Sequence, residues 1–266
     1  MVSAGDELSG AWNFRDVSEQ TGVASGVFFR ASELSRLNDD GRAALAGYGV
    51  TDVADLRTLR ELERHGRGLV PAGVDVHHLP FIETVASDGQ APHEHAFQRM
   101  MTDKPDGESV GAAAARYMTE EYGRIASAPL AQRAVRQVVT LLGSGHRVLA
   151  HCFAGKDRTG FTVAVVLQAA GVDHDAVMAD YLRSNNAVPR LRESILATVR
   201  ERAAGTPEVL EMAEARLTDS VLGVQEEYLV TALRTIGDEY GSIDGYVAAA
   251  GVTDDELGRL RSALRG

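Results

Sequence analysis

The sequence predicts an α/β fold in which helices flank a central, mostly parallel sheet. Short apolar runs bounded by turn residues alternate with longer segments of helical spacing. The 266 residues, 44% of them hydrophobic, suffice for one large domain. Residues 147–171 join an apolar strand, a tight loop and an apolar helix, which is how α/β proteins place ligand residues at the carboxyl end of a strand. We therefore expect a single domain over residues 1–266.

The first third of the chain supplies three strands of this sheet. Residues 26–30 and 50–56 have the composition of short strands. Between them, Asn38 is a suitable N-cap for a helix that ends at Gly49. A short helix rich in Arg and Glu follows the second strand, and residues 74–81 form the third strand.

The segment Trp12–Val17, which precedes the first strand, offers two aromatic anchors and two charges. We expect Trp12 and Phe14 to hold the N-terminus on the core. Arg15 and Asp16 are adjacent and of opposite sign, so we expect a structural ion pair between them.

The middle of the chain changes from irregular to helical. Residues 82–109 are rich in Gly, Pro, His and Asp, and long loops of this kind are often functional. Helices are predicted over residues 112–125 and 131–142, and another begins after Asp173 as N-cap. From residue 189 to the end, Gly, Pro and Asp divide a series of amphipathic helices.

The stretch HCFAGKDRTG carries the candidate chemistry. Cys152, the only cysteine in the chain, lies six positions before Arg158. The helix that follows presents N–H groups without partners and a partial positive charge, so that its start binds anions. Arg158 adds a planar fork that matches two phosphate oxygens. The intervening residues complete the expected phosphate-binding loop: Phe153, Ala154, Gly155, Lys156 and Asp157.

This arrangement favours a thiolate at Cys152, which is the nucleophilic form of cysteine. A thiolate that faces a bound phosphate attacks phosphorus, forms a phosphocysteine and is released by water. The reaction needs no cofactor. One cysteine excludes an internal disulfide and argues against a cysteine-based zinc cluster, and the histidines lack a companion carboxylate pattern, so no metal site is expected.

The loop resembles the signature of the cysteine-dependent protein phosphatases, and its Ala-Gly-Lys-Asp-Arg form is similar to that of the bacterial tyrosine and phosphoinositide phosphatases. The segments NFRD, DLRTLRE and YGSIDGYVAAAG resemble the same family. The resemblance implies a tyrosine-phosphatase-like fold and tyrosine phosphatase activity, with phosphoserine, phosphothreonine and phosphoinositide substrates beside it. It also implies that helices in the 189–266 part form a lid over the site. Ordinary packing helices are the alternative.

The general acid has two candidates. Asp157 lies in the loop and is the preferred donor to the leaving oxygen, while Glu83 in the irregular segment is the alternative. Asp157 could instead be a charge partner of Arg158 or Lys156. The supporting residues also have two interpretations each. Thr159 bonds the cysteine sulfur or caps the helix. Arg57 orients the loop or the substrate, or forms an i, i+4 ion pair with Glu61.

His151 is expected to fix the loop from behind without touching substrate. Lys156 is one of only two lysines, and its place in the loop favours a phosphate-binding role and a broad, lipid-tolerant specificity.

Composition limits the partners. The net charge of −11 argues against non-specific nucleic-acid binding and against general adsorption to membranes. No apolar run approaches the roughly 18 residues of a membrane span. The N-terminus lacks the pattern of a signal peptide, so a cytoplasmic location is the default, and the resemblance adds secretion without such a signal. The expected partner is a phosphorylated protein or phosphoinositide. The oligomeric state stays open, and a silent phosphate-binding module and a rhodanese-like sulfur carrier are the competing functions.

Overall fold

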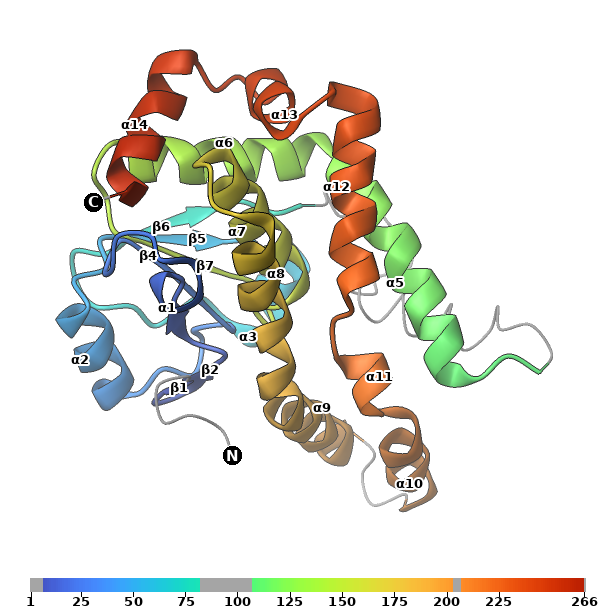
Figure 1. The fold of residues 1–266 in the computed structure, drawn as a ribbon. Helices are drawn as coiled ribbons and strands as arrows, with labels where there is room; N and C mark the ends of the chain where they lie inside the picture. The colour runs from blue at the N-terminus through green and yellow to red at the C-terminus, as the bar shows by residue number, and fades with distance from the viewer. Residues whose placement is uncertain (1–6, 82–106, 203–206, 266) are drawn as a thin grey trace.

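A five-stranded sheet lies at the centre of the computed structural model, which describes residues 7–81, 107–202 and 207–265 (Figure 1). Its strand order is β3-β4-β7-β5-β6. All neighbours pair in parallel except β3 and β4, which are antiparallel. The fold class and the three early strands are thereby confirmed. The strands span Arg15–Asp16 (β3), Phe28–Ala31 (β4), Val148–His151 (β7), Asp52–Asp55 (β5) and Asp75–His78 (β6).

Each face of the sheet has its own apolar cluster. Phe28 and Ala150 point to the face that α6 (Pro129–Gly143) and α7 (Asp157–Ala169) cover. Phe29 points to the opposite face, toward α2 (Asp39–Gly47) and the hairpin of β1 (Glu7–Leu8) and β2 (Ala11–Trp12). This alternation is the period of two that a strand imposes, and it explains why the central strands are buried throughout.

The predicted helix ends in the first third are confirmed. Asn38 caps α2 by accepting the Gly41 N–H at 3.0 Å, and Gly49 follows the helix with φ 69°. Thr58 caps α3 (Leu59–His65) in a reciprocal capping box with Glu61. Before β4, the short α1 (Ser18–Thr21) carries the chain from β3.

The N-terminal segment is anchored as expected, but its ion pair is not the predicted one. Phe14 is buried and stacks on Phe29 with ring centroids 5.9 Å apart. The predicted pair between Arg15 and Asp16 is wrong, because neighbours on a strand point to opposite faces. Arg15 binds Asp180 at 2.7 Å, and Asp16 instead accepts the Gly26 N–H at 2.6 Å.

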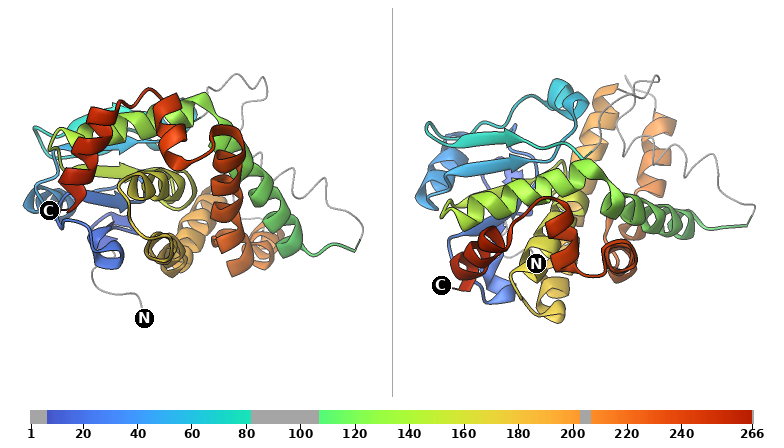
Figure 2. Two further views of the ribbon diagram at one scale, coloured as in Figure 1. Left: turned by 45° about the horizontal axis from the view of Figure 1, so that its top comes forward. Right: turned by 90° about the horizontal axis from the view of Figure 1, so that it is seen from above.

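Two long helices pack side by side away from the sheet. They are α5 (Val110–Ser127), which confirms the predicted helix over 112–125, and α12 (Glu226–Tyr240) (Figures 1 and 2). The helix predicted after Asp173 is α8 (His174–Arg183), and the 3-10 turn η1 (Ser184–Ala187) follows it.

The C-terminal helices divide into two groups. In Figure 2, α13 (Ile243–Ala249) and α14 (Asp254–Arg265) lie along α6, with which both are in contact. The other group is α9 (Val188–Arg202), α10 (Pro207–Arg216) and α11 (Asp219–Leu222). In this group α9 contacts both α10 and α11, at the end of the molecule far from α14 (Figure 1). Among the described residues, no helix combines the length and apolar character that crossing a bilayer requires.

Candidate active site

The candidate loop connects the middle strand of the sheet to a buried helix. Strand β7 ends at His151, and α7 begins at Asp157. Cys152 directly follows the strand and is 2% exposed. Because β7 lies between β4 and β5, the carboxyl ends of three parallel strands meet at this loop.

The loop turns sharply at Gly155. This residue has φ 66°, a backbone conformation that residues other than glycine rarely adopt. A Cβ there would lie 2.2 Å from the Ala31 carbonyl oxygen, so the backbone of β4 also excludes any larger residue. The glycine therefore lets the loop close directly over the end of the sheet.

The start of α7 offers backbone donors to an anion. The first N–H with an acceptor in the helix is that of Gly160, which donates to the Lys156 carbonyl at 2.9 Å. The N–H groups of residues 157–159 precede it and find no acceptor within the helix. They lie at the positive end of the helix dipole, where phosphate binds well.

Arg158 is fixed by a carboxylate that belongs to a different helix. Its two terminal nitrogens each donate to an oxygen of Glu61 at 2.7 Å, and Nη1 also reaches the Leu56 carbonyl at 3.2 Å. Burial lowers the pKa of Arg158, but the Glu61 carboxylate outweighs that effect and raises the pKa above its ordinary value. The guanidinium is therefore permanently charged and set in one plane.

Arg57 forms ion pairs with Asp55 and Glu33, and the Glu61 carboxylate is also close enough to stabilise its charge. Arg57 precedes the N-cap Thr58 and lies outside the helix, so the helical i, i+4 rule does not apply to Arg57 and Glu61. It is buried, binds Asp55 at 2.6 Å and binds Glu33 at 2.9 Å. Burial lowers the pKa of Arg57, but the neighbouring carboxylates outweigh burial and raise the pKa above its ordinary value.

His151 is the last residue of β7 and directly precedes Cys152. It is fully buried, and its Nδ1 is 3.1 Å from the Cys152 carbonyl oxygen. Its Nε2 is 3.7 Å from Asp55 but makes no hydrogen bond. Burial lowers the pKa of His151 below its ordinary value, so the ring is held in the neutral form.

Asp157 is held between a tyrosine and a lysine. The Tyr122 hydroxyl donates to its Oδ1 at 3.2 Å, and the Lys156 ammonium lies 3.0 Å from its Oδ2. Tyr181 in turn donates to the Tyr122 oxygen at 2.8 Å. Burial raises the pKa of both tyrosines well above the ordinary value, so both remain neutral donors. The other candidate acid, Glu83, lies outside the described residues.

The two interpretations of Thr159 are both wrong in this structure. Its hydroxyl is buried and makes no hydrogen bond to Cys152 or to any other described group. The N-cap position belongs to Lys156, whose side chain makes no cap bond. Thr159 stands two residues beyond the first helical residue, so its side chain is already part of the helix packing.

An apolar cluster joins the loop to the C-terminal helices. Ala154 packs with Val188 and Leu191 of α9 and with Leu222 of α11, and Phe153 borders the same cluster. Phe153 also contacts the His65 ring, with centroids 5.1 Å apart. Helices α9 and α11 therefore lie directly against the phosphate-loop candidate.

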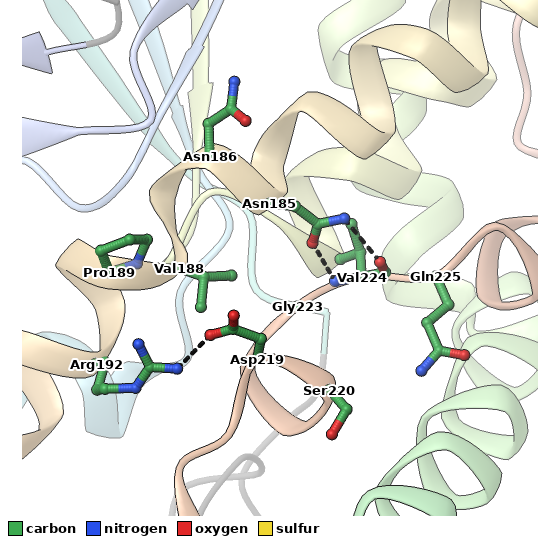
Figure 3. A pocket seen from close by; sticks show the side chains of 10 residues that line it. All are labelled: Asn185, Asn186, Val188, Pro189, Arg192, Asp219, Ser220, Gly223, Val224 and Gln225. Atoms are coloured by element: carbon green, nitrogen blue, oxygen red, sulfur yellow. Dashed lines mark hydrogen bonds and ion pairs between the residues drawn. The ribbon is translucent and has the colours of Figure 1, made fainter. Parts of the chain in front are cut away.

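A cavity of about 500 Å³ opens beside this contact. An ion pair between Arg192 of α9 and Asp219 of α11 lies at its wall (Figure 3). Asn185 closes another side by bonding both backbone polar groups of Val224. Lys156 connects the loop to this region, since its ammonium donates to the Gly223 carbonyl at 3.4 Å.

Sequence reasoning missed several residues that contact the loop. Asn13 donates to the Ala154 and Gly155 carbonyls at 3.2 and 3.0 Å, and Arg30 donates to the Gly155 carbonyl at 2.7 Å. Asn13 lies in the NFRD segment, where only resemblance drew attention to it. Glu61 had a local signal, the capping-box spacing from Thr58, but nothing in the sequence pairs it with Arg158.

Almost the entire sequence matches a protein-family model. Residues 6–266 match the family described as the tyrosine phosphatase family.

Two curated relatives cover most of the chain. The triple specificity protein phosphatase PtpB of Mycobacterium tuberculosis is 52% identical over 98% of this chain and 99% of its own length. A tyrosine-protein phosphatase of Nostoc commune is 28% identical over 92% of this chain and 76% of its own length. These matches agree with the geometry of the loop, the buried helix start and the fixed arginine. The chain belongs to the tyrosine phosphatase family.

Proposed function

We propose that this protein hydrolyses phosphate monoesters through a phosphocysteine intermediate, with phosphotyrosine in proteins as its main substrate. The observation that carries the proposal is the placement of Cys152 and Arg158 at the two ends of one anion-binding loop, with the arginine fork set by Glu61. The N–H groups at the start of α7 and the guanidinium bind the phosphate oxygens.

The reaction proceeds in two displacements. In the first, the Cys152 sulfur bonds to phosphorus while the bond from phosphorus to the substrate oxygen breaks and that oxygen takes a proton. In the second, water bonds to phosphorus, gives up a proton, and the bond to sulfur breaks to release inorganic phosphate. The donors around the loop stabilise the charge on the phosphate oxygens in both steps.

Asp157 is the proposed proton carrier. It gives its proton to the leaving oxygen in the first displacement and takes one from water in the second. Tyr122 and Lys156 both donate toward its carboxylate, which suits the charged form that the second step requires. The variants Asp157→Asn and Glu83→Gln distinguish the two candidate acids, because only loss of the true acid slows substrates with poor leaving groups selectively.

We propose a broad substrate range for the same site. The PtpB relative is named a triple specificity protein phosphatase. In this chain Lys156 adds a cation next to the loop, and its side chain is 12% exposed. Phosphoserine, phosphothreonine and phosphoinositide substrates therefore accompany phosphotyrosine in the proposal. Helices α9–α11, which pack on Ala154, are proposed as the lid over the site.

The deciding experiment compares wild type with Cys152→Ser on a phosphotyrosine peptide, a phosphoserine peptide and phosphatidylinositol 3-phosphate without added metal. Release by wild type alone supports the thiolate mechanism, and the relative rates rank the substrates. If neither protein releases phosphate, the mechanism fails, and a thiosulfate sulfurtransferase assay and a phosphate-binding assay test the sulfur carrier and the silent binding module.

The cellular location is a separate proposal. A cytoplasmic protein is the default, and secretion without a signal peptide is the alternative suggested by resemblance. Detection of the protein in culture medium that is free of a cytoplasmic marker would establish secretion.

A further inference from the structure

Two buried arginines behind the phosphate loop share a single carboxylate. Arg15 Nε lies 2.7 Å from Asp180 Oδ1, and Arg30 Nη1 lies 2.6 Å from Asp180 Oδ2. The side chains of Arg15, Arg30 and Asp180 are at most 2% exposed. Two guanidinium groups against one carboxylate leave one positive charge in excess.

This excess charge persists at neutral pH. Burial, followed by repulsion from Arg30, lowers the pKa of Arg15 to about 10, so Arg15 stays protonated. Burial raises the pKa of Asp180, but the two arginines outweigh it and bring the pKa below its ordinary value, so Asp180 stays ionised. A buried charge without a partner is costly, which calls for a compensating negative charge nearby.

The cluster reaches the loop through one carbonyl. Arg30 Nη2 donates to the Gly155 carbonyl at 2.7 Å and to the Ser184 hydroxyl at 3.1 Å. Asn13 donates to the same Gly155 carbonyl at 3.0 Å. Arg15 fixes that amide, because its Nη1 donates to Asn13 Oδ1 at 2.6 Å and an arginine has only donors.

We propose that Arg30 is a positioning residue of the phosphate loop, supported by Arg15 and Asp180. It holds the Gly155 carbonyl toward the interior, and the excess charge of the cluster favours a doubly negative phosphate on the other side of the loop. This inference rests on the phosphatase function proposed above, because a phosphate in the loop is the compensating anion.

Charge in a poorly solvated interior acts over longer distances than charge at the surface. The cluster therefore complements the bound phosphate without touching it. Arg158 touches the substrate phosphate in the proposal, whereas Arg30 acts through the backbone of Gly155. A purely structural cluster would affect stability and leave anion affinity unchanged.

The test uses Arg30→Met and Arg30→Lys. Arg30→Met leaves Arg15 and Asp180 as a balanced pair, so the protein is expected to fold. Binding of inorganic phosphate is measured by calorimetry, and kcat and KM are measured with p-nitrophenyl phosphate. We expect Arg30→Met to weaken phosphate binding and raise KM by about 10- to 100-fold. Arg30→Lys keeps the charge and is expected to recover a substantial part of the affinity.

Arg261→Met is the matched control. Arg261 joins α14 to the Ala169 carbonyl and to Asp244 at 2.9 Å, at a distance from the loop in the fold. If Arg30→Met loses stability in urea as the control does and keeps phosphate affinity and KM, the positioning role is excluded.

A second variant covers the case in which Arg30→Met does not fold. Arg15→Met removes the same excess charge and leaves Arg30 and Asp180 as a balanced pair, with Nη1 and Oδ2 2.6 Å apart. It should weaken phosphate binding in the same direction, and unchanged binding would overturn the proposal. The calorimetry needs no turnover. If wild type binds phosphate but hydrolyses nothing, the proposed function fails while the inference on Arg30 is still decided.

Discussion

Arg158 and Glu61 join through two hydrogen bonds of 2.7 Å each, although 97 residues separate them in the chain. Glu61 Oε2 also accepts the Thr58 N–H at 2.8 Å and the Thr58 hydroxyl at 2.9 Å. One carboxylate thus serves both the N-terminus of α3 and the arginine of the candidate active site. The orientation of the Arg158 guanidinium is therefore coupled to the start of α3, the helix that follows the neighbouring strand β5.

The substitution Glu61→Gln should lower kcat/KM for phosphotyrosine peptide by about 10- to 100-fold, because Arg158 loses the two-point acceptor that fixes its plane. Steady-state kinetics measures the effect. Glu63→Gln is the matched control, since Glu63 is an exposed residue of the same helix. Equal kcat/KM values for the two variants would show that the Arg158 guanidinium keeps its orientation without the Glu61 carboxylate.

The substitution Tyr122→Phe should slow the hydrolysis of substrates with poor leaving groups more than that of substrates with good ones. It removes the hydroxyl that donates to Asp157, and a misplaced acid matters most where the leaving oxygen needs a proton. We expect kcat to fall about 5-fold with phosphoserine peptide and to change little with p-nitrophenyl phosphate. Tyr228→Phe serves as control, because its ring packs 5.7 Å from that of Tyr122 in the same cluster. A uniform loss on both substrates would argue against a role through Asp157.

The stability of the protein should fall as pH decreases below the ordinary histidine pKa of about 6.5. Burial lowers the pKa of His151 in the folded state, so below that pH the unfolded chain binds a proton that the folded chain does not. The free energy of unfolding then rises with pH, by at most about 1.4 kcal/mol per pH unit from this group.

Urea unfolding at pH 7.0 and 5.5 measures this dependence. His151→Asn should show a smaller difference between the two pH values than wild type. An identical difference in both proteins would mean that another group carries the pH dependence.

Asp52 should matter for stability and not for catalysis. It is 2% exposed and accepts hydrogen bonds from His77 at 2.7 Å and from His146 at 2.6 Å. It lies at the amino end of β5, whereas the candidate loop lies at the carboxyl end of the neighbouring strand. We expect Asp52→Asn to lower the free energy of unfolding by about 1–3 kcal/mol and to leave kcat/KM unchanged.

Urea unfolding and phosphate-release kinetics test this separation. The control is Asp75→Asn, because Asp75 pairs with Asp52 in register but is exposed. If the Asp52→Asn protein were fully folded and still lost activity, Asp52 would contribute to catalysis as well as to stability, and the prediction would be wrong.

The sequence could predict those elements whose form depends on neighbouring residues in the chain. Asn38, Gly49 and Asp173 mark helix boundaries because caps and left-handed turns depend on neighbouring residues. The strand, loop and helix around Cys152 were predicted for the same reason. The family resemblance was carried by this loop, and the family match over residues 6–266 confirms it.

The partners of buried charges could not be predicted in this way. Arg15 has an acidic neighbour in sequence but binds Asp180, 165 residues away, because strand geometry sends Asp16 to the other face. Arg57 and Glu61 have helical spacing, yet the helix begins between them. Such pairs are fixed by the packing of whole elements, and a single sequence contains no local record of that packing.

The order of strands has a consequence for how the chain folds. Strand β7 lies between β4 and β5, although it follows both by about a hundred residues in the chain. Because β4 and β5 each pair with β7, the edges of both strands that face β7 have no native partner until residues 148–151 are synthesised. Closing the sheet and placing Cys152 above it are therefore one event. A nascent chain that stops short of β7 lacks Cys152 and also carries two strand edges without their native partner, and such unpaired edges promote aggregation.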